Sequence, residues 1–370
     1  MRIDKKIYLD NAATSFPKPT CVVREVNRCI KHYCGNPGRS SHYLSMRAAE
    51  EVYNTREVIA KHLGGVEAEN IVFTPNATFA LNLAIKTLIP DNCHVLCTDY
   101  EHNSVIRPLN RLCRERGISY STFSSSDSVA EKIQDNTKAI VASITSNVTG
   151  EEFDLIALSK IARERNLLLI IDASQALGHR RINLVDTPCD ALCAPGHKAL
   201  FGIQGSGFVY LRDSKRKDSF LEGGSGYNSK NPDMPILLPE AYEAGTLSTP
   251  AIVSLGEGVR FVDYVGVENI SSHLNVLTSK LYNMLSTIDG IKIYGNNSGI
   301  LSFNYRDVSS AKLASELNDK GICVRGGLHC APLAHEKYGT INQGMVRVSL
   351  SYLNNEKDIL RLFTAIKEII

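Results

Sequence analysis

The chain has 370 residues, of which 43% are hydrophobic and 22% are charged, and its formal net charge is +2. A chain of this size is expected to bury its own core without disulfide or metal staples. It contains no block of like charge and no run of about 18 apolar residues, so neither a nucleic-acid partner nor a membrane is indicated. Ten cysteines without a signal-peptide pattern predict reduced thiols and a cytoplasmic protein.

Strand-like and helix-like segments alternate through the first two thirds of the chain. The predicted strands are residues 7–9, 71–73, 95–97, 139–144, 167–171 and 207–211, and the predicted helices are 78–88, 105–116 and 154–165. The five aliphatic residues 167–171 fit a strand buried on both faces. This alternation predicts an α/β fold with a mostly parallel sheet between two layers of helices.

The pattern changes after about Thr249. A long helical stretch, 251–288, is interrupted near Gly266, and it is followed by a strand at 299–304 and a helix at 309–320. Strands at 322–324 and 345–350 and a last helix from residue 355 complete a smaller α+β unit. We therefore expect a large domain of residues 15–250 and a small domain of residues 1–14 and 251–370.

Two cysteine pairs, Cys93/Cys97 and Cys189/Cys193, have the same spacing. Zinc ligands are conceivable there, but the first pair brackets a strand-like segment. Small thiols on buried strands are the more usual case. We expect no metal site.

The strongest local motif runs from Gly196 to Gly207 and places Lys198 just before a glycine-rich turn. A phosphate-binding P-loop is excluded, because its lysine follows the glycines. A lysine in a tight, partly desolvated turn can lose its proton and act as an amine nucleophile. Taken alone, the motif fits a surface turn equally well.

A carboxylate, Asp172, directly follows the buried strand 167–171. The carboxyl end of such a strand faces the crevice where open α/β sheets bind ligands, and a carboxylate there could keep a pyridine nitrogen protonated. Asp172 and Lys198 are 26 positions apart in the sequence, which leaves room for a helix and another strand. A helix cap is the alternative role for Asp172.

Two further segments follow predicted strands. Ala77 and Thr78 lie at the start of a predicted helix, where backbone amides and a hydroxyl form a phosphate site. His102 follows the next strand and could stack on an aromatic cofactor, although most loop histidines have no such role.

Together with residues 8–14, these segments resemble the class V aminotransferase family, fold type I of the pyridoxal-5′-phosphate (PLP) enzymes. The resemblance implies PLP as cofactor, a seven-stranded sheet in the large domain, and a homodimer. It also implies that Lys198 forms the Schiff base and that Asp172 pairs with the pyridine nitrogen. Gln175 would contact the ring hydroxyl, His102 would stack on the ring, and Asn147 would lie near the ring. The phosphate would be held by Ala77, Thr78, His197 and, across the dimer, Thr246.

The chain departs from the family pattern at two positions. Pro195 stands where many relatives have a small hydroxyl residue, so one phosphate contact is missing. Asn76 stands where a glycine is common, and asparagine tolerates left-handed geometry.

The segment from Cys323 to Pro332 has the glycines and proline of an exposed loop, and it contains Cys330 directly after His329. A thiolate is favoured near cationic donors, although one cysteine among ten could also be incidental. The segment resembles the catalytic loop of cysteine desulfurases and selenocysteine lyases, with Cys330 at the persulfide-forming position. The histidine before it is typical of the second of the two desulfurase groups.

Asn147 and four further side chains are candidates for substrate binding. Arg347 lies on a predicted strand, where a guanidinium suits bidentate capture of an α-carboxylate, and the resemblance implies that role. Arg325 is a second candidate near the substrate. Arg39 and His42 match family positions near the substrate entrance.

These residues and the resemblance together predict a PLP-dependent cysteine desulfurase that converts L-cysteine to L-alanine and passes sulfur from a Cys330 persulfide to an acceptor protein or thiol. A selenocysteine lyase acting on L-selenocysteine is the nearest alternative. Another class V chemistry, such as a β-lyase or an aminotransferase, and a non-enzymatic partner that retained the fold also stay open.

Overall fold

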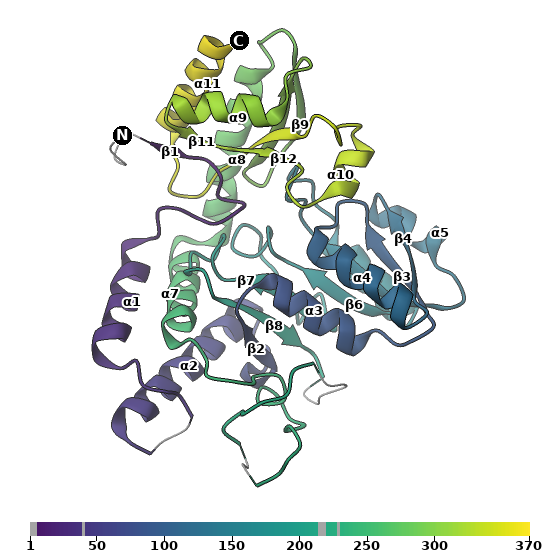
Figure 1. Ribbon diagram of the computed structural model, residues 1–370, viewed down its shortest axis with the longest axis vertical. Coiled ribbons are helices and arrows are strands. Elements are labelled where there is room, and N and C mark those ends of the chain that lie inside the picture. Colours follow the sequence, from purple (N-terminus) through teal and green to yellow (C-terminus); the bar gives the residue numbers. More distant parts are fainter. Residues whose placement is uncertain (1–5, 39–40, 214–219, 228–229) are drawn as a thin grey trace.

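The protein is described by a computed structural model that covers residues 6–38, 41–213, 220–227 and 230–370 (Figure 1). Its largest sheet has seven strands in the order β2-β8-β7-β6-β5-β3-β4. These strands are β2 Ile71–Thr74, β3 His94–Thr98, β4 Ser119–Phe123, β5 Thr137–Ser143, β6 Leu168–Asp172, β7 Ala191–Pro195 and β8 Gly207–Leu211. Strand β8 runs antiparallel to β2 and β7, and the other neighbouring pairs of these described strands are parallel, so the predicted mostly parallel sheet is confirmed.

Helices cover both faces of this sheet. They are α1 Thr20–His32, α2 Tyr43–His62, α3 Ala77–Leu88, α4 Asn103–Glu115, α5 Val129–Lys132, α6 Leu155–Glu164 and α7 Thr249–Val265. Helices α3 and α4 share a core with one face, and α2, α6 and α7 share a core with the other. Ile140 and Ile171 lie in one core while Val141 and Ile170 lie in the other, which is why the central residues of these two strands are aliphatic.

The C-terminal part adds a second, antiparallel sheet in the order β12-β13-β10-β9. Its strands are β9 Ile291–Asn297, β10 Ile300–Tyr305, β12 Arg325–Gly327 and β13 Met345–Ser349, and the helices beside it are α8 Val267–Leu285, α9 Ser310–Asp319, α10 Pro332–Lys337 and α11 Glu356–Ile369. Strand β1 (Ile7–Tyr8) pairs in parallel with β11 (Ile322–Cys323), so the start of the chain joins this unit.

Gly266 separates α7 from α8 with a φ of 88°, where the sequence predicted an interruption. Helix α8 packs with α9 and α11 in a separate core, whereas α7 packs against α1 and α2 beside the large sheet (Figure 1). The division near residue 250 stays a prediction. No helix in the described ranges is both long and apolar enough to cross a bilayer.

The sequence left room for a helix between Asp172 and Lys198, but the structure, which describes this whole segment, has no helix there. The segment 173–190 forms turns instead. Gly178 has a left-handed φ of 95°, and the amide of Leu184 donates to the carbonyl of Leu63. The segment therefore satisfies part of its backbone by bonding to the loop after α2.

Candidate active site

A pocket lies where four parallel strands of the large sheet end. Strands β3, β5, β6 and β7 are neighbours, and Asp172 at the end of β6 pairs with Ser143 and Cys193. The carboxyl ends of parallel strands are the usual ligand-binding edge of such a sheet. The pocket measures about 230 Å³, and the predicted residues that line it are Ala77, Thr78, His102, Asn147, Asp172, Gln175, His197, Lys198, Arg325 and Arg347.

Lys198 stands in the tight turn after β7. The amide of Gly202 donates to the carbonyl of Gly196 at 2.8 Å, and a Cβ at Gly196 would clash with Ser206 Oγ. Burial lowers the pKa of the Lys198 amine to about 8, and the Asp172 carboxylate only partly offsets this effect. The turn therefore holds an amine that is deprotonated more readily than an ordinary lysine.

Asp172 and Gln175 also line the pocket. The amide of Ser174 donates to Asp172 Oδ1 at 2.9 Å, and the Asp172 side chain is buried. Gln175 Nε2 donates to the carbonyl of Ala12 at 3.0 Å. These bonds fix both side chains before any ligand is bound.

His102, Ser104 and Thr78 form a hydrogen-bonded chain at the start of α3 and α4. The hydroxyls of Thr78 and Ser104 lie 2.7 Å apart, and Ser104 donates its amide to His102 Nδ1 at 3.0 Å. Because Nδ1 accepts this bond, Nε2 carries the proton of the neutral ring. Burial lowers the pKa of His102 to about 4, so the ring is neutral at physiological pH.

Asn76 stands where a glycine is common in the family, but it does not adopt left-handed backbone. Its φ is −173°, which is extended backbone, and its side-chain oxygen accepts the amide of Phe79 at 2.9 Å. Asparagine therefore acts as the N-cap of α3, and the amides of Ala77 and Thr78 precede the first intrahelical bond. Pro195 ends β7 in the pocket wall.

Arg347 reaches the pocket from β13 and is 1% exposed. Its Nη2 donates to Asp10 Oδ1 at 2.7 Å, and its Nη1 donates to the carbonyl of Asn147 at 2.9 Å. A buried guanidinium held in one orientation is suited to recognise a carboxylate.

Cys330 is exposed and lies in the loop between β12 and α10, outside the lining of the 230 Å³ pocket. It lines a neighbouring hollow together with His102. The φ values of His329 and Cys330 are 52° and 57°, so both residues adopt left-handed backbone. Arg325 Nη2 lies 4.0 Å from the sulfur, and the amide of Asn103 donates to the carbonyl of Cys330 at 2.7 Å.

Comparison with known proteins agrees with this geometry. The family description Aminotransferase class-V matches residues 7–362. A probable cysteine desulfurase from Methanothermobacter thermautotrophicus is 31% identical over 98% of this chain and 94% of its own length, and one from Pyrococcus abyssi is 28% identical over the same shares. The apo structure of a cysteine desulfurase from Thermococcus onnurineus superposes with a TM-score of 0.92 at 28% identity, covering 99% of this chain and 95% of that one.

The chain belongs to the class V aminotransferase family. Enzymes of this family use PLP, and the pocket fits that cofactor. Three buried polar atoms of its lining have no hydrogen-bond partner within the described ranges, namely Thr145 Oγ1, His197 Nδ1 and Arg347 Nε. Buried polar groups are normally satisfied, so these atoms mark positions where a polar ligand would bind.

Three predicted residues of this class V protein lie elsewhere. Thr246 is exposed and does not line the pocket. His42 caps α2 by accepting the amide of Ser45 at 3.3 Å, and it is also exposed. Arg39 lies outside the described residues.

Sequence reasoning missed Glu101, which is fully buried and bonded to Ser143 of the pocket lining. Its carboxylate accepts the Thr98 hydroxyl at 2.7 Å and both the amide and the hydroxyl of Ser143, at 2.8 and 2.7 Å. Burial, with a smaller contribution from the nearby Asp172, raises the pKa of Glu101 to about 7, although the hydrogen bonds from Ser143 and Thr98 oppose the shift. Its place directly before His102 was the only available signal, because nothing local shows that an acidic residue is buried.

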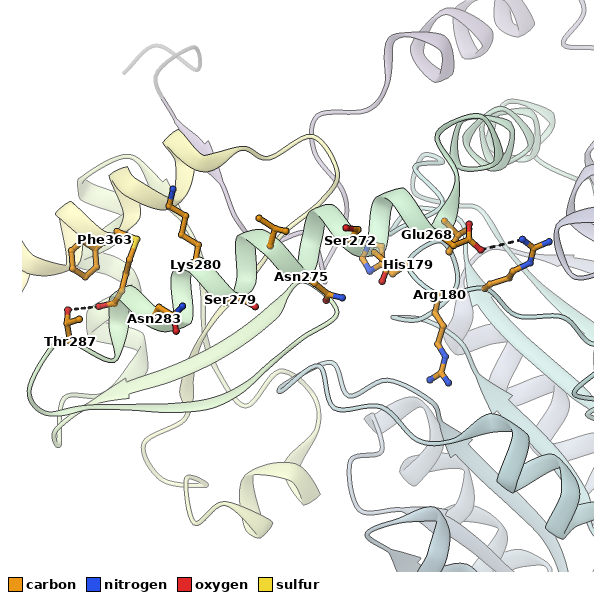
Figure 2. Close-up of a pocket in the computed structure, with 15 residues that line it drawn as sticks. His179, Arg180, Glu268, Ser272, Asn275, Ser279, Lys280, Asn283, Thr287 and Phe363 are labelled. Carbon is orange, nitrogen blue, oxygen red and sulfur yellow. Dashed lines mark hydrogen bonds and ion pairs between the residues drawn. The ribbon is translucent and has the colours of Figure 1, made fainter.

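A larger hollow of about 1150 Å³ runs along α8, away from these motifs (Figure 2). Arg181 and Glu268 form an ion pair in it at 3.4 Å. Its described lining contains no cysteine and none of the residues that the sequence motifs single out. The chemistry is therefore assigned to the smaller pocket, despite the difference in volume.

Proposed function

We propose that this class V enzyme is a PLP-dependent cysteine desulfurase that uses Cys330 as its sulfur-accepting nucleophile. The observation that carries the proposal is the position of Cys330. The thiol is exposed beside the cofactor pocket, and the Arg325 guanidinium lies 4.0 Å from its sulfur. A cationic donor at that place is suited to interact with a negatively charged sulfur.

The α-carboxylate of L-cysteine would bind Arg347. Asp10 and the Asn147 carbonyl hold two of its nitrogens, while Nε has no protein partner among the described residues. The guanidinium is therefore oriented before the substrate arrives, which lowers the entropic cost of placing the substrate.

Bound PLP supplies an electron sink for the negative charge that develops at Cα. Asp172 is placed to hold a proton on the ring nitrogen, and Lys198 attaches the cofactor. The Lys198 amine, whose pKa burial lowers to about 8, then takes the proton from Cα as a general base. Neutral His102 is suited to stack on the ring, and His197 and Thr78 to hold the phosphate.

The Cys330 thiolate then attacks the substrate sulfur. A sulfur–sulfur bond forms and the substrate Cβ–S bond breaks, so that L-cysteine and the Cys330 thiol become L-alanine and a Cys330 persulfide. An acceptor thiol, free or on a protein, takes the outer sulfur and restores Cys330. The exposure of Cys330 supports this last step, since an acceptor needs access to it.

Further features of the proposal concern assembly and location. Exposed Thr246 suits a homodimer in which it reaches the phosphate of the neighbouring subunit, and His42 and Arg39 would lie near the substrate entrance. All ten cysteines are free, which agrees with a cytoplasmic protein.

The test is to incubate the holoenzyme and its Cys330→Ser variant with L-cysteine and dithiothreitol and to measure L-alanine and sulfide. Cys330→Ser should keep the visible absorbance of bound PLP but lose product formation by about a hundredfold or more. Cys34→Ser, which changes another exposed cysteine, is the control and should behave as wild type. Equal turnover in Cys330→Ser would refute the assignment, and turnover of L-selenocysteine alone would favour a selenocysteine lyase.

A further inference from the structure

Side chains outside the lining of the cofactor pocket fasten the segment that follows Cys330 to the loops at the edge of the large sheet. Helix α10 begins two residues after Cys330 and ends at Lys337, with Tyr338 as its C-cap. The last residues of α10 contact two loops that follow β3 and β5. We call this group of five residues the α10 clasp: Asp99, Tyr100, Glu151, Lys337 and Tyr338.

Tyr338 makes the first half of the clasp. Its hydroxyl donates to Glu151 Oε2 at 2.6 Å and lies 3.2 Å from the hydroxyl of Tyr100, which is 3% exposed. Burial and the hydrogen bond to Glu151 raise the pKa of Tyr338 to about 12, so it stays a donor. The Thr149 hydroxyl donates to the same Glu151 oxygen at 3.0 Å.

Lys337 makes the second half. Its Nζ donates to the Tyr100 hydroxyl at 2.5 Å and pairs with Asp99 at 3.2 Å. The same ammonium lies 4.0 Å from the centroid of the Tyr100 ring, within the range of a cation–π interaction. Charge-assisted bonds of this kind are stronger than neutral ones and fix the end of α10.

Each loop in the clasp also carries a residue of the candidate site. Asp99 and Tyr100 precede His102 and Asn103, and Thr149 and Glu151 follow Asn147. Asn103 and Asn147 in turn bind the loop backbone, at the carbonyls of Cys330 and His329, at 2.7 and 2.8 Å. The Cys330 loop is therefore held directly by these two loops and again, through α10, by the clasp.

We propose that the α10 clasp sets the position of Cys330 relative to the cofactor pocket, an inference that rests on the proposed desulfurase function. Its members are positioning residues, because none of them lines the pocket. Residues 329 and 330 both adopt left-handed backbone, a conformation that non-glycine residues do not favour. Contacts from elsewhere must therefore maintain it, and the clasp supplies those on the α10 side.

The test uses Tyr338→Phe, which removes one hydroxyl and keeps the ring that packs edge-on against Tyr294 at 5.5 Å. Persulfide formation on Cys330, followed in a single turnover by mass spectrometry, should slow about tenfold, since small misplacements of a reacting group are costly. PLP absorbance and the KM for L-cysteine should stay within about twofold of wild type. Tyr264→Phe, which changes an exposed tyrosine, is the matched control.

Glu151→Gln keeps the shape of the side chain and serves as the second variant, also if Tyr338→Phe does not fold. It should slow the same step, and the double variant should be little slower than either single one. Persulfide formation within twofold of wild type in both variants would overturn the inference. Equal losses in PLP binding and KM would overturn it too, because they would indicate a general loss of structure.

A second readout separates this inference from the proposed function. If wild-type protein forms no persulfide, the desulfurase proposal fails. The clasp is then judged by iodoacetamide alkylation of Cys330, measured on its peptide, whose rate should change about threefold or more in Tyr338→Phe because the loop is held less firmly. An unchanged alkylation rate would refute the clasp independently.

Discussion

The cofactor side of the site and the cysteine side are built in different ways. Asp172 ends a buried parallel strand and Lys198 lies in the turn after the next one, so the sheet itself places them. Cys330 lies in an irregular, left-handed loop that is held by side chains and amides of other segments. The strand ends follow from local sequence pattern, whereas the loop depends on contacts between distant residues.

Lys198→Ala is the largest perturbation of the cofactor side. Without the amine, PLP loses its attachment and the Cα proton loses its base, so turnover should fall about a thousandfold or more. The visible absorbance of the holoenzyme should be lost or shifted, as measured on purified protein. Lys160→Ala changes an exposed lysine and is the control.

Lys198→Ala also tests whether the Cys330 loop depends on the cofactor side of the site. Because Asn103 and Asn147 hold the cysteine loop, alkylation of Cys330 by iodoacetamide should stay close to the wild-type rate in apo protein with Lys198→Ala. A large change in that rate would show that the loop also depends on the lysine turn.

Arg347 touches both sides, since its Nη1 binds the carbonyl of Asn147 and the Asn147 side chain binds the carbonyl of His329. Arg347→Lys keeps the charge but loses the planar pair of donors. We expect kcat/KM for L-cysteine to fall about a hundredfold, which corresponds to about 2–3 kcal/mol. Steady-state kinetics should place most of the loss in KM, with exposed Arg24→Lys unchanged. An unaltered KM would remove Arg347 from substrate binding.

The sequence predicted which residues gather in one pocket at the strand ends, because these signals are local, while the roles of these residues stay predictions. Buried strands show as aliphatic runs, and Asp172, Thr78 and His102 each follow such a run. The break between α7 and α8 was also visible at Gly266. Helix α2 was missed, since its inner face buries polar residues, among them Glu51, Thr55 and Arg56, that conceal the apolar period.

What could not be predicted are residues that act through distant contacts. The buried carboxylate of Glu101 is bonded by Ser143 and Thr98, and Asp10, which lies just after β1, pairs with Arg347. Tyr338 joins the site through Glu151, 187 residues earlier in the chain. A short sequence motif does not show which residues far apart in the chain will come into contact.

The smallest effect concerns the pH at which apo protein attaches its cofactor. If Lys198 attaches PLP, as we propose, only its neutral amine reacts with the aldehyde, and burial lowers the pKa of this amine to about 8. The rate of attachment should rise about tenfold per pH unit below that value and level off above it, whereas an ordinary lysine would level off near 10.4. Because Asp172 raises this pKa, Asp172→Asn should move the midpoint to lower pH. Stopped-flow absorbance across the pH range measures both midpoints, and a wild-type midpoint near that of free lysine would show that the turn does not desolvate the amine.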